Sequence, residues 1–202
     1  MARVLMLDVD GVIVHPKDGR HWSTNLQRDL GIDPIALQTH FFAAHWEQIV
    51  TGQLDLYECI SNVLASIASD ITPERLVSYW FEHDGALDER VLNSLVIIRA
   101  SAIKVYLTTN QEHIRMHHLM DVGGLRRYVD GCYYSAAVGC RKPRRAFFDA
   151  VLPSFTCASE LLLVDDSPDN IAAALAAGWS AEHWEPHMDL HEIVRRRITS
   201  PR

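Results

Sequence analysis

The stretch Met1-Ala-Arg-Val-Leu-Met-Leu-Asp-Val-Asp-Gly-Val-Ile-Val14 decides the fold. Its residues 4–7 form an unbroken apolar run, which is typical of a strand buried on both faces of a parallel sheet. Asp8 and Asp10 follow at once, and Gly11 provides a turn. Because an unpaired ionised carboxylate is very costly to bury, both side chains belong at the carboxyl end of the strand. Open α/β sheets bind their ligands at that edge.

The spacing of Asp8 and Asp10 directs both side chains into one site, since side chains alternate along a strand. Mg²⁺ prefers oxygen ligands and is usually held by one or two carboxylates together with substrate phosphate and water. An aspartate can take up a phosphoryl group covalently, and a second carboxylate can protonate the leaving oxygen and later activate water. An Asx-type turn is the alternative interpretation, and residues further along the chain have to decide between the two.

Composition limits the class of protein. The chain has 202 residues, 48% hydrophobic and 22% charged, which predicts a globular domain, alone or with an insert. A net charge of −7 argues against a nucleic-acid or membrane-surface partner. Widely spaced cysteines without a CxxC pair favour reduced thiols and make a zinc site an unfavoured interpretation. With no signal peptide or long apolar run, we expect a soluble, cytoplasmic protein.

An α/β pattern is interrupted by a helical stretch. Residues 15–21 are polar and rich in turn residues, and from Ser23 to about His83 the chain carries only helical signals, with helices starting near Asp33-Pro34, Asp55 and Thr72-Pro73. We therefore predict a helical insert over 16–83 and a catalytic core formed by 1–15 and 84–202. The core strands are expected at 103–107, 131–135, 161–164 and 179–184, and the helices at 88–100, 111–120, 143–152, 169–177 and 190–198. This alternation predicts an α/β fold with a Rossmann-like, doubly wound parallel sheet.

Polar residues gather where the predicted strands end. Asp8 and Asp10 follow the first strand, Thr109 and Asn110 another, Asp165 and Asp166 a third, and Lys142 precedes a helix that we expect to begin at Pro143. In a doubly wound sheet these ends share one edge. The two later aspartates can complete a Mg²⁺ site with Asp8 and the backbone carbonyl of Asp10. Lys142 can balance the negative charge, and the Thr109 hydroxyl can hold phosphoryl oxygens.

The four motifs resemble those of the haloacid dehalogenase superfamily, in the same order: Asp8-x-Asp10-Gly-Val, Leu107-Thr-Thr109-Asn, Gly139-x-x-Lys142-Pro143 and Leu163-Val-Asp165-Asp166-Ser-x-x-Asn170. The helical insert resembles the C1 cap of that family. The resemblance implies Asp8 as nucleophile and Asp10 as general acid and then base. It further implies phosphate binding by Thr109, charge neutralisation by Lys142, and Mg²⁺ binding by Asp165 and Asp166.

The resulting hypothesis is a Mg²⁺-dependent phosphatase acting on a small phosphorylated metabolite such as a sugar phosphate. A phosphomutase similar to β-phosphoglucomutase, a 2-haloacid dehalogenase and a non-catalytic binding module are the alternatives. The acid at Asp10 favours the phosphatase over the dehalogenase, because an alkoxide leaving group needs a proton.

Three finer assignments complete the expected site. Asn110 joins Thr109 and Lys142 as a phosphate-binding residue. Gly52, in the loop of residues 51–54, is the candidate substrate contact from the cap, although a helix stop is the simpler explanation for this glycine. Asp169 is the expected N-cap of the last core helix before residue 178. The sequence leaves open how Asp165 and Asp166 divide metal coordination, and which oligomer forms.

Overall fold

The apolar run near the N-terminus forms the central strand of the sheet. β1 (Val4–Leu7) pairs in parallel with β4 (Lys104–Thr109) on one side and with β6 (Leu161–Asp165) on the other. β5 (Gly131–Tyr134) and β7 (Ser180–His183) extend it to the order β5-β4-β1-β6-β7, with every pair parallel. The structure, a computed structural model, describes residues 3–198. The predicted doubly wound parallel sheet is confirmed.

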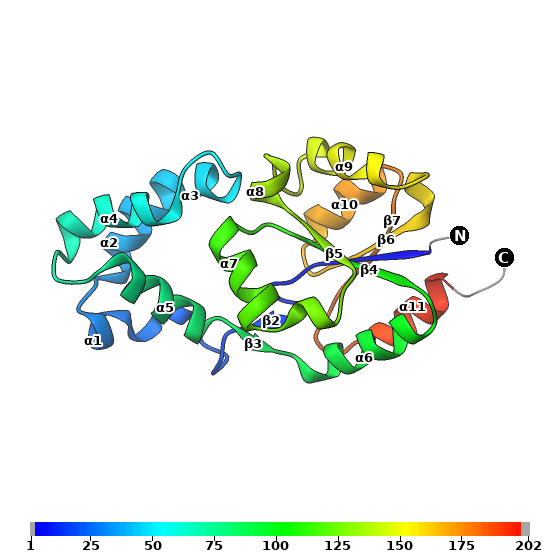
Figure 1. Ribbon diagram of the computed structural model, residues 1–202, viewed down its shortest axis with the longest axis horizontal. Coiled ribbons are helices and arrows are strands. Elements are labelled where there is room, and N and C mark those ends of the chain that lie inside the picture. The colour runs from blue at the N-terminus through cyan, green and yellow to red at the C-terminus, as the bar shows by residue number, and fades with distance from the viewer. Residues whose placement is uncertain (1–2, 199–202) are drawn as a thin grey trace.

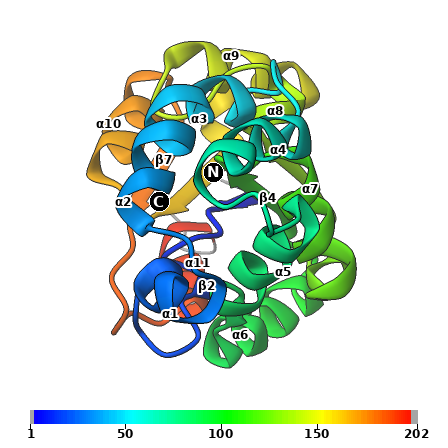
Figure 2. The same ribbon diagram turned by 90° about the vertical axis from the view of Figure 1, so that its left-hand side faces the viewer.

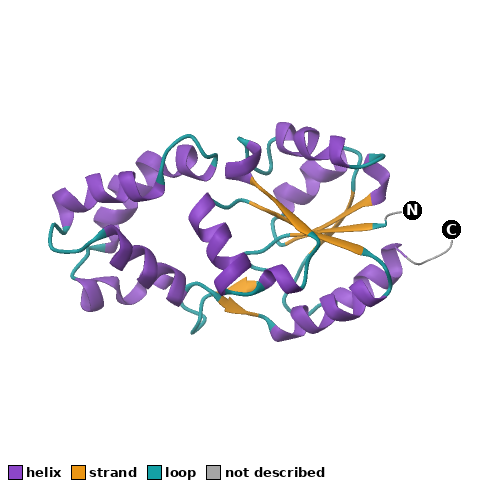
Figure 3. Ribbon diagram, viewed as in Figure 1, coloured by secondary structure: helices purple, strands orange, loops and turns teal. Residues whose placement is uncertain are grey.

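The two faces of the sheet are covered by different helices (Figures 1 and 3). Leu5 and Leu7 belong to a core built with α6 (Glu89–Ala100), α7 (His113–His117) and α11 (Leu190–Ile198). Val4 and Met6 point the other way, into a core built with α9 (Arg145–Val151) and α10 (Pro168–Ala176). Successive side chains of β1 thus enter opposite cores, which explains why the run has no polar member.

A second group of helices lies to one side of the sheet (Figures 1 and 2). It runs from a 3₁₀ turn at Trp22–Asn25 through α1 (Leu26–Leu30), α2 (Pro34–Leu37), α3 (Ala43–Val50), α4 (Leu56–Ile67) and α5 (Pro73–His83). We call residues 22–83 the helical unit. It has a hydrophobic cluster of its own, and Asp33, Asp55 and Thr72 cap its helices as predicted. The domain boundaries at 16 and 83 stay a prediction.

The helical unit is joined to the sheet by two chain segments that pair with each other. β2 (Val14–His15) and β3 (Ala86–Leu87) form a short antiparallel ribbon. Neither strand was predicted, because two residues carry no alternating pattern. The remaining elements are α8 (Ser135–Val138), π-helical turns at Gln38–Phe42 and His118–Val122, and 3₁₀ turns at Leu125–Arg127, Leu152–Ser154 and Ala158–Glu160. Within residues 3–198, no helix combines the length and apolar character that crossing a bilayer requires.

Three predicted helix details are wrong. The helix that starts after Asp33 is interrupted by the π-helical turn at Gln38–Phe42, which lets Phe41 and Phe42 both contact Trp46. The helix expected at Pro143 begins two residues later, at Arg145, because the backbone of Lys142 is held in a turn by Asn110. Ser167, not Asp169, caps α10, with Pro168 in its first turn.

Candidate functional site

Lys142 stands at the centre of the candidate site. Its side chain is fully buried, and its Nζ lies 3.1 Å from Oδ1 of Asp8 and 2.5 Å from Oδ2 of Asp165. The ammonium also donates to the backbone carbonyl of Thr108 at 2.5 Å. These partners come from the carboxyl ends of β1, β6 and β4. The topology therefore brings three separate stretches of the chain to one buried cation, as the sequence predicted for this edge.

The buried charges shift one another. Burial raises the pKa of Asp8 to about 7, although Lys142 opposes the rise and Asp165 adds to it. Burial also opposes the charged form of Lys142, but Asp8 and Asp165 outweigh it and raise the pKa of that ammonium. Burial and the neighbouring Asp165 raise the pKa of Asp166. The site therefore carries more negative charge than its single lysine neutralises, a condition that favours a cation.

Three carboxylates lie close enough to share one cation. Asp8, Asp165 and Asp166 each offer an oxygen, and these oxygens lie within 4.8 Å of one another. Gly11 makes room for the cluster: it has a φ of +78°, and a Cβ at this position would come within 2.1 Å of Oδ2 of Asp166. The left-handed turn after Asp10 thus requires this glycine, and the Asp166 carboxylate would have to move to admit a Cβ.

Asp165 and Asp166 differ in how their carboxylates are used. Asp165 is fully buried, and both of its oxygens accept hydrogen bonds. Oδ1 accepts from the Ser167 amide at 2.9 Å and from Nδ2 of Asn170 at 2.9 Å. Oδ2 accepts from the same Nδ2 at 3.1 Å and from Lys142. Asp166 is exposed. Asn170 lies five residues after Asp165, in the first turn of α10, and this position accounts for its reach.

Asn110 holds the backbone of Lys142. Its Oδ1 accepts from the Lys142 amide at 2.9 Å and its Nδ2 donates to the Lys142 carbonyl at 3.0 Å. This contact positions the lysine, and phosphate binding by Asn110 stays a prediction. Thr108 and Thr109 are both buried at the end of β4 and belong to the strand itself. The Oγ1 of Thr108 has no hydrogen-bond partner within residues 3–198.

Asp10 is held by two residues that the sequence analysis did not select. Arg115 donates from Nη2 to Oδ1 of Asp10 at 2.8 Å, and Gln111 donates from Nε2 to Oδ2 at 2.5 Å. Desolvation by the surrounding residues raises the pKa of the Asp10 carboxyl, although 51% of its side chain is exposed, and Arg115 counteracts the rise. Gln111 and Arg115 are four positions apart and follow the Thr109-Asn110 motif. Gln111 precedes α7, which begins at His113, so no helical spacing joins it to Arg115, and the sequence carried no signal for this pair.

Gly52 lies against the core. It has a φ of +74°, and a Cβ there would come within 2.4 Å of the carbonyl oxygen of Ala136 in α8. Nearby, Ser135 donates from Oγ to the carbonyl of Val50 at 2.5 Å. Figures 1 and 2 both show the end of α3 beside α8. The close approach explains this glycine, and its contact with a substrate stays a prediction.

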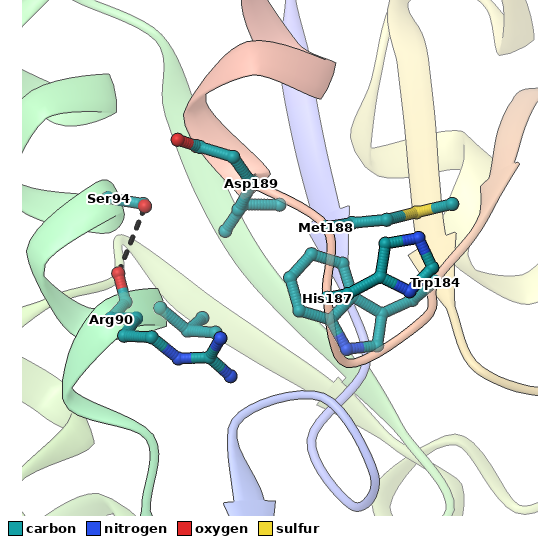
Figure 4. Close-up of a pocket in the computed structure, with 8 residues that line it drawn as sticks. Arg90, Ser94, Trp184, His187, Met188 and Asp189 are labelled. Atoms are coloured by element: carbon teal, nitrogen blue, oxygen red, sulfur yellow. Dashed lines mark hydrogen bonds between the residues drawn. The ribbon is translucent and has the colours of Figure 1, made fainter.

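A separate cavity of about 320 Å³ lies elsewhere on the core (Figure 4). Arg90 and Ser94 of α6 stand on one side of it, and Trp184 and His187 on the other. None of its lining residues belongs to the predicted site. The acidic cluster around Lys142, rather than this cavity, is the candidate site.

The parallel sheet and the carboxylates at its edge define an α/β enzyme with a Rossmann-like core. The chain belongs to the haloacid dehalogenase-like hydrolases, whose family model matches residues 2–178. The predicted family and the predicted hydrolase class are thereby confirmed. The C1 branch of that family stays a prediction.

Relatives extend the comparison. A curated protein, the sesquiterpene phosphatase astK of Aspergillus oryzae, is 28% identical over 156 residues, which cover 74% of this chain and 79% of the relative. An enzyme of the haloacid dehalogenase family from Bacteroides thetaiotaomicron, solved with magnesium and inorganic phosphate, has a TM-score of 0.79 at 18% identity, over 96% of this chain and all of the other. A hydrolase of the same type from Porphyromonas gingivalis has a TM-score of 0.80 at 17% identity, over 100% of both chains. These two structures show a shared fold.

Proposed function

We propose that the protein is a Mg²⁺-dependent phosphatase that hydrolyses a small phosphorylated metabolite through an aspartyl-phosphate on Asp8. The observation that carries the proposal is the buried Lys142 ammonium, which contacts the carboxylates of Asp8 and Asp165 at the sheet edge. Phosphoryl transfer requires positioning and charge neutralisation more than covalent chemistry, and this arrangement supplies both. The phosphatase among the relatives and the family membership agree with it.

The acidic cluster fits a magnesium ion. Its oxygens lie within 4.8 Å of one another, and carboxylate oxygens are the donors that Mg²⁺ prefers. We assign Asp8 and Asp166 as direct ligands, with the backbone carbonyl of Asp10. Asp165 then holds Lys142 and Asn170, because its oxygens already accept hydrogen bonds from them. When bound, the ion would neutralise phosphoryl oxygens beside the nucleophile.

The chain's own residues then divide the reaction. An oxygen of Asp8 attacks phosphorus while the bond to the leaving oxygen breaks, and Asp10 gives its proton to that oxygen. Asp10 next takes a proton from a water, whose oxygen attacks the phosphorus of the aspartyl-phosphate and releases Asp8. Lys142 balances the charge on Asp8 and the phosphoryl group throughout. The Thr109 hydroxyl, at the end of β4, is the proposed phosphate ligand.

The leaving alcohol is proposed to be small, with sugar phosphates and isoprenoid phosphates as the two classes to compare. The aromatic group of the helical unit belongs to its own hydrophobic cluster, where Trp22 and Trp80 are buried, so it favours neither class. Trp22 stacks on Trp80 with ring centroids 5.2 Å apart, and Phe42 and Trp46 lie 5.6 Å from Trp80. Trp80 in turn lies 5.7 Å from the guanidinium carbon of Arg115, which binds Asp10. What supports the second class is the curated relative named as a sesquiterpene phosphatase.

The test is a phosphate-release screen over sugar phosphates, nucleotides, phosphoglycolate, flavin mononucleotide and farnesyl monophosphate, with Mg²⁺ and with EDTA. We expect release that requires Mg²⁺ and stops on chelation. Sugar phosphates are also followed for isomerisation: conversion of one isomer into another without phosphate release would indicate the mutase. Chloride release from 2-chloropropionate without Mg²⁺ would indicate the dehalogenase, and inactivity on every compound would contradict catalysis.

A further inference from the structure

Arg115 is a buried arginine that the proposed chemistry does not use directly. It lies in α7 with 3% of its surface exposed. Arginine is seldom buried unless its donors are satisfied, because removing an unpaired charge from water is costly. The partners that satisfy it therefore indicate what the residue does.

Those partners come from both parts of the molecule. Nη2 donates to Oδ1 of Asp10 at 2.8 Å and to the backbone carbonyl of Asp84 at 2.9 Å, while Nη1 donates to Oδ2 of Asp84 at 3.1 Å. The rings of Trp80 and Phe81, in α5, lie 5.7 and 5.8 Å from the guanidinium carbon. One planar group thus connects the proposed general acid with the end of the helical unit.

Asp84 lies between the last helix of the helical unit and the ribbon formed by β2 and β3. It ends α5, the last helix of the helical unit, and its amide donates to the carbonyl of Trp80 at 3.0 Å. Trp80 also donates from Nε1 to Oδ2 of Asp84 at 3.2 Å. Two residues later the chain enters β3, which pairs with β2. Any movement of the helical unit about this ribbon therefore moves the groups that orient Arg115.

The other oxygen of Asp10 is connected to the helical unit in a similar way. Gln111, which donates to Oδ2 of Asp10, has a backbone carbonyl that lies 3.1 Å from Oγ of Ser135. The same hydroxyl is 2.5 Å from the carbonyl of Val50, the last residue of α3. Both oxygens of Asp10 are held by core residues. Arg115 contacts the C-cap of α5, and Gln111 is joined through Ser135 to the end of α3.

We propose that Arg115 is a positioning residue that holds the Asp10 carboxylate in its reactive orientation only while Asp84, the C-cap that directly follows the last helix of the helical unit, is docked against α7. Docking of the helical unit and orientation of the proton donor are then one event, because Nη2 shares its hydrogen bonds between Asp10 and Asp84. The inference rests on the proposed function, since it takes Asp10 as the general acid.

The first test compares two phosphate esters. Hydrolysis of p-nitrophenyl phosphate needs little protonation of its leaving group, whereas an alkyl phosphate needs much more. For Arg115→Met we expect turnover of the alkyl ester to fall by about 10²-fold and that of p-nitrophenyl phosphate by less than about tenfold. Arg115→Lys should recover part of the difference, because an ammonium can reach Asp10 but cannot bridge it to Asp84 in the same plane. Arg126→Met, at an exposed arginine paired with Asp121, is the matched control and should leave both rates unchanged.

A double-mutant cycle separates positioning from a general structural role. In an Asp10→Asn background, which has no proton to give, Arg115→Met should lower the alkyl-ester rate by less than about a further threefold.

A second test uses Asp84→Asn, a change at a residue with 24% side-chain exposure that leaves Arg115 and Asp10 in place. It should produce the same selective loss at smaller size, and faster amide hydrogen exchange in residues 14–20 and 84–88.

The outcomes are distinguishable. Equal losses for the two esters, or additive losses in the Asp10→Asn background, would overturn the positioning role while the phosphatase stands. If Arg115→Met does not fold, Asp84→Asn decides, and an unselective loss there overturns the inference. A wild-type protein that hydrolyses neither ester would remove the proposed function and this inference together.

Discussion

Asp8 is the residue on which the proposed chemistry depends. Asp8→Asn should lower turnover by about 10³-fold or more, because the amide is a poor nucleophile and a poorer metal ligand. Phosphate release measures the loss, and circular dichroism confirms that the variant is folded. Asp169→Asn applies the same change to an exposed residue in the first turn of α10 and should leave turnover unchanged. Residual activity above about a tenth of the wild-type rate would contradict the assignment of the nucleophile.

Lys142 should matter to stability as well as to turnover. Lys142→Met leaves the Asp8 and Asp165 carboxylates without their counter-charge, and breaking a buried pair in this way costs about 3–5 kcal/mol. Urea unfolding at pH 8 measures the free energy of unfolding. Lys17→Met removes an exposed lysine that lies 4.0 Å from Glu82, so a change below about 0.5 kcal/mol is expected. Similar losses for the two variants would show that the buried ammonium contributes little.

The sequence predicted which side chains meet wherever the topology of the sheet alone brings them together. Asp8, Lys142 and Asp165 could be predicted to meet because each lies at the carboxyl edge of the sheet. Arg115 and Asn170 could not, since their roles depend on which way a helical side chain points after its own strand. The position of Asn110 was predicted, but its hydrogen bonds to the Lys142 backbone were not.

At the scale of elements, the contact between α3 and α8 gives a test with an internal control. Gly52 and Gly31 both have positive φ, +74° and +70°, so alanine is strained at either position. Only Gly52 faces a neighbour, the carbonyl of Ala136 at 2.4 Å from a Cβ, while nothing lies within 4 Å at Gly31. The left-handed backbone should cost each alanine about 1 kcal/mol in the free energy of unfolding, and the clash with the Ala136 carbonyl should make Gly52→Ala cost more than Gly31→Ala.

The two variants should differ in catalysis. Gly52→Ala pushes the turn after α3 away from α8, so we expect KM to rise several-fold, whereas Gly31→Ala should leave KM and kcat unchanged. Steady-state kinetics on one substrate measures both. Equal kinetics in the two variants would mean that the docking of this turn does not affect the site.

Helix ends were predictable where a capping residue stands next to a proline, as at Asp33 and Thr72. They were not where tertiary contacts compete. The Lys142 backbone is held by Asn110, which delays α9 to Arg145, and Ser167 caps α10 in place of Asp169. Local propensity predicts that a helix is present, whereas its first residue depends on hydrogen bonds to the residues that precede it.

At the scale of the whole molecule, a sheet covered on both faces meets a helical unit through β2 and β3 and through the contacts of Asp84 and Val50 (Figure 1). The unbroken apolar run of β1 predicted the first part, since each face of the strand enters its own core. No comparable sequence pattern predicted where the helical unit lies relative to the sheet. It rests on side-chain contacts between segments far apart in the sequence.

The folded molecule should also respond to pH through its metal site. The pKa of Asp8 is raised to about 7 from an ordinary value of 3.8, mainly by burial. The folded metal-free protein therefore binds this proton more tightly than the unfolded chain does. The stabilisation that results is fully present below about pH 4 and is lost as the pH rises through about 7. Mg²⁺ binds the ionised carboxylate, so it competes with the same proton.

We therefore expect saturation with Mg²⁺ to raise Tm more at pH 8 than at pH 5.5, with an apparent affinity that falls by up to about tenfold per pH unit below 7. Thermal unfolding with Mg²⁺ and with EDTA across this range measures the difference in Tm. Asp8→Asn removes the titrating group and should flatten the pH dependence, while Asp169→Asn should keep it. A Mg²⁺-induced rise in Tm that is the same at both pH values would mean that Asp8 does not exchange its proton for the metal, and that the ion, if bound, sits elsewhere.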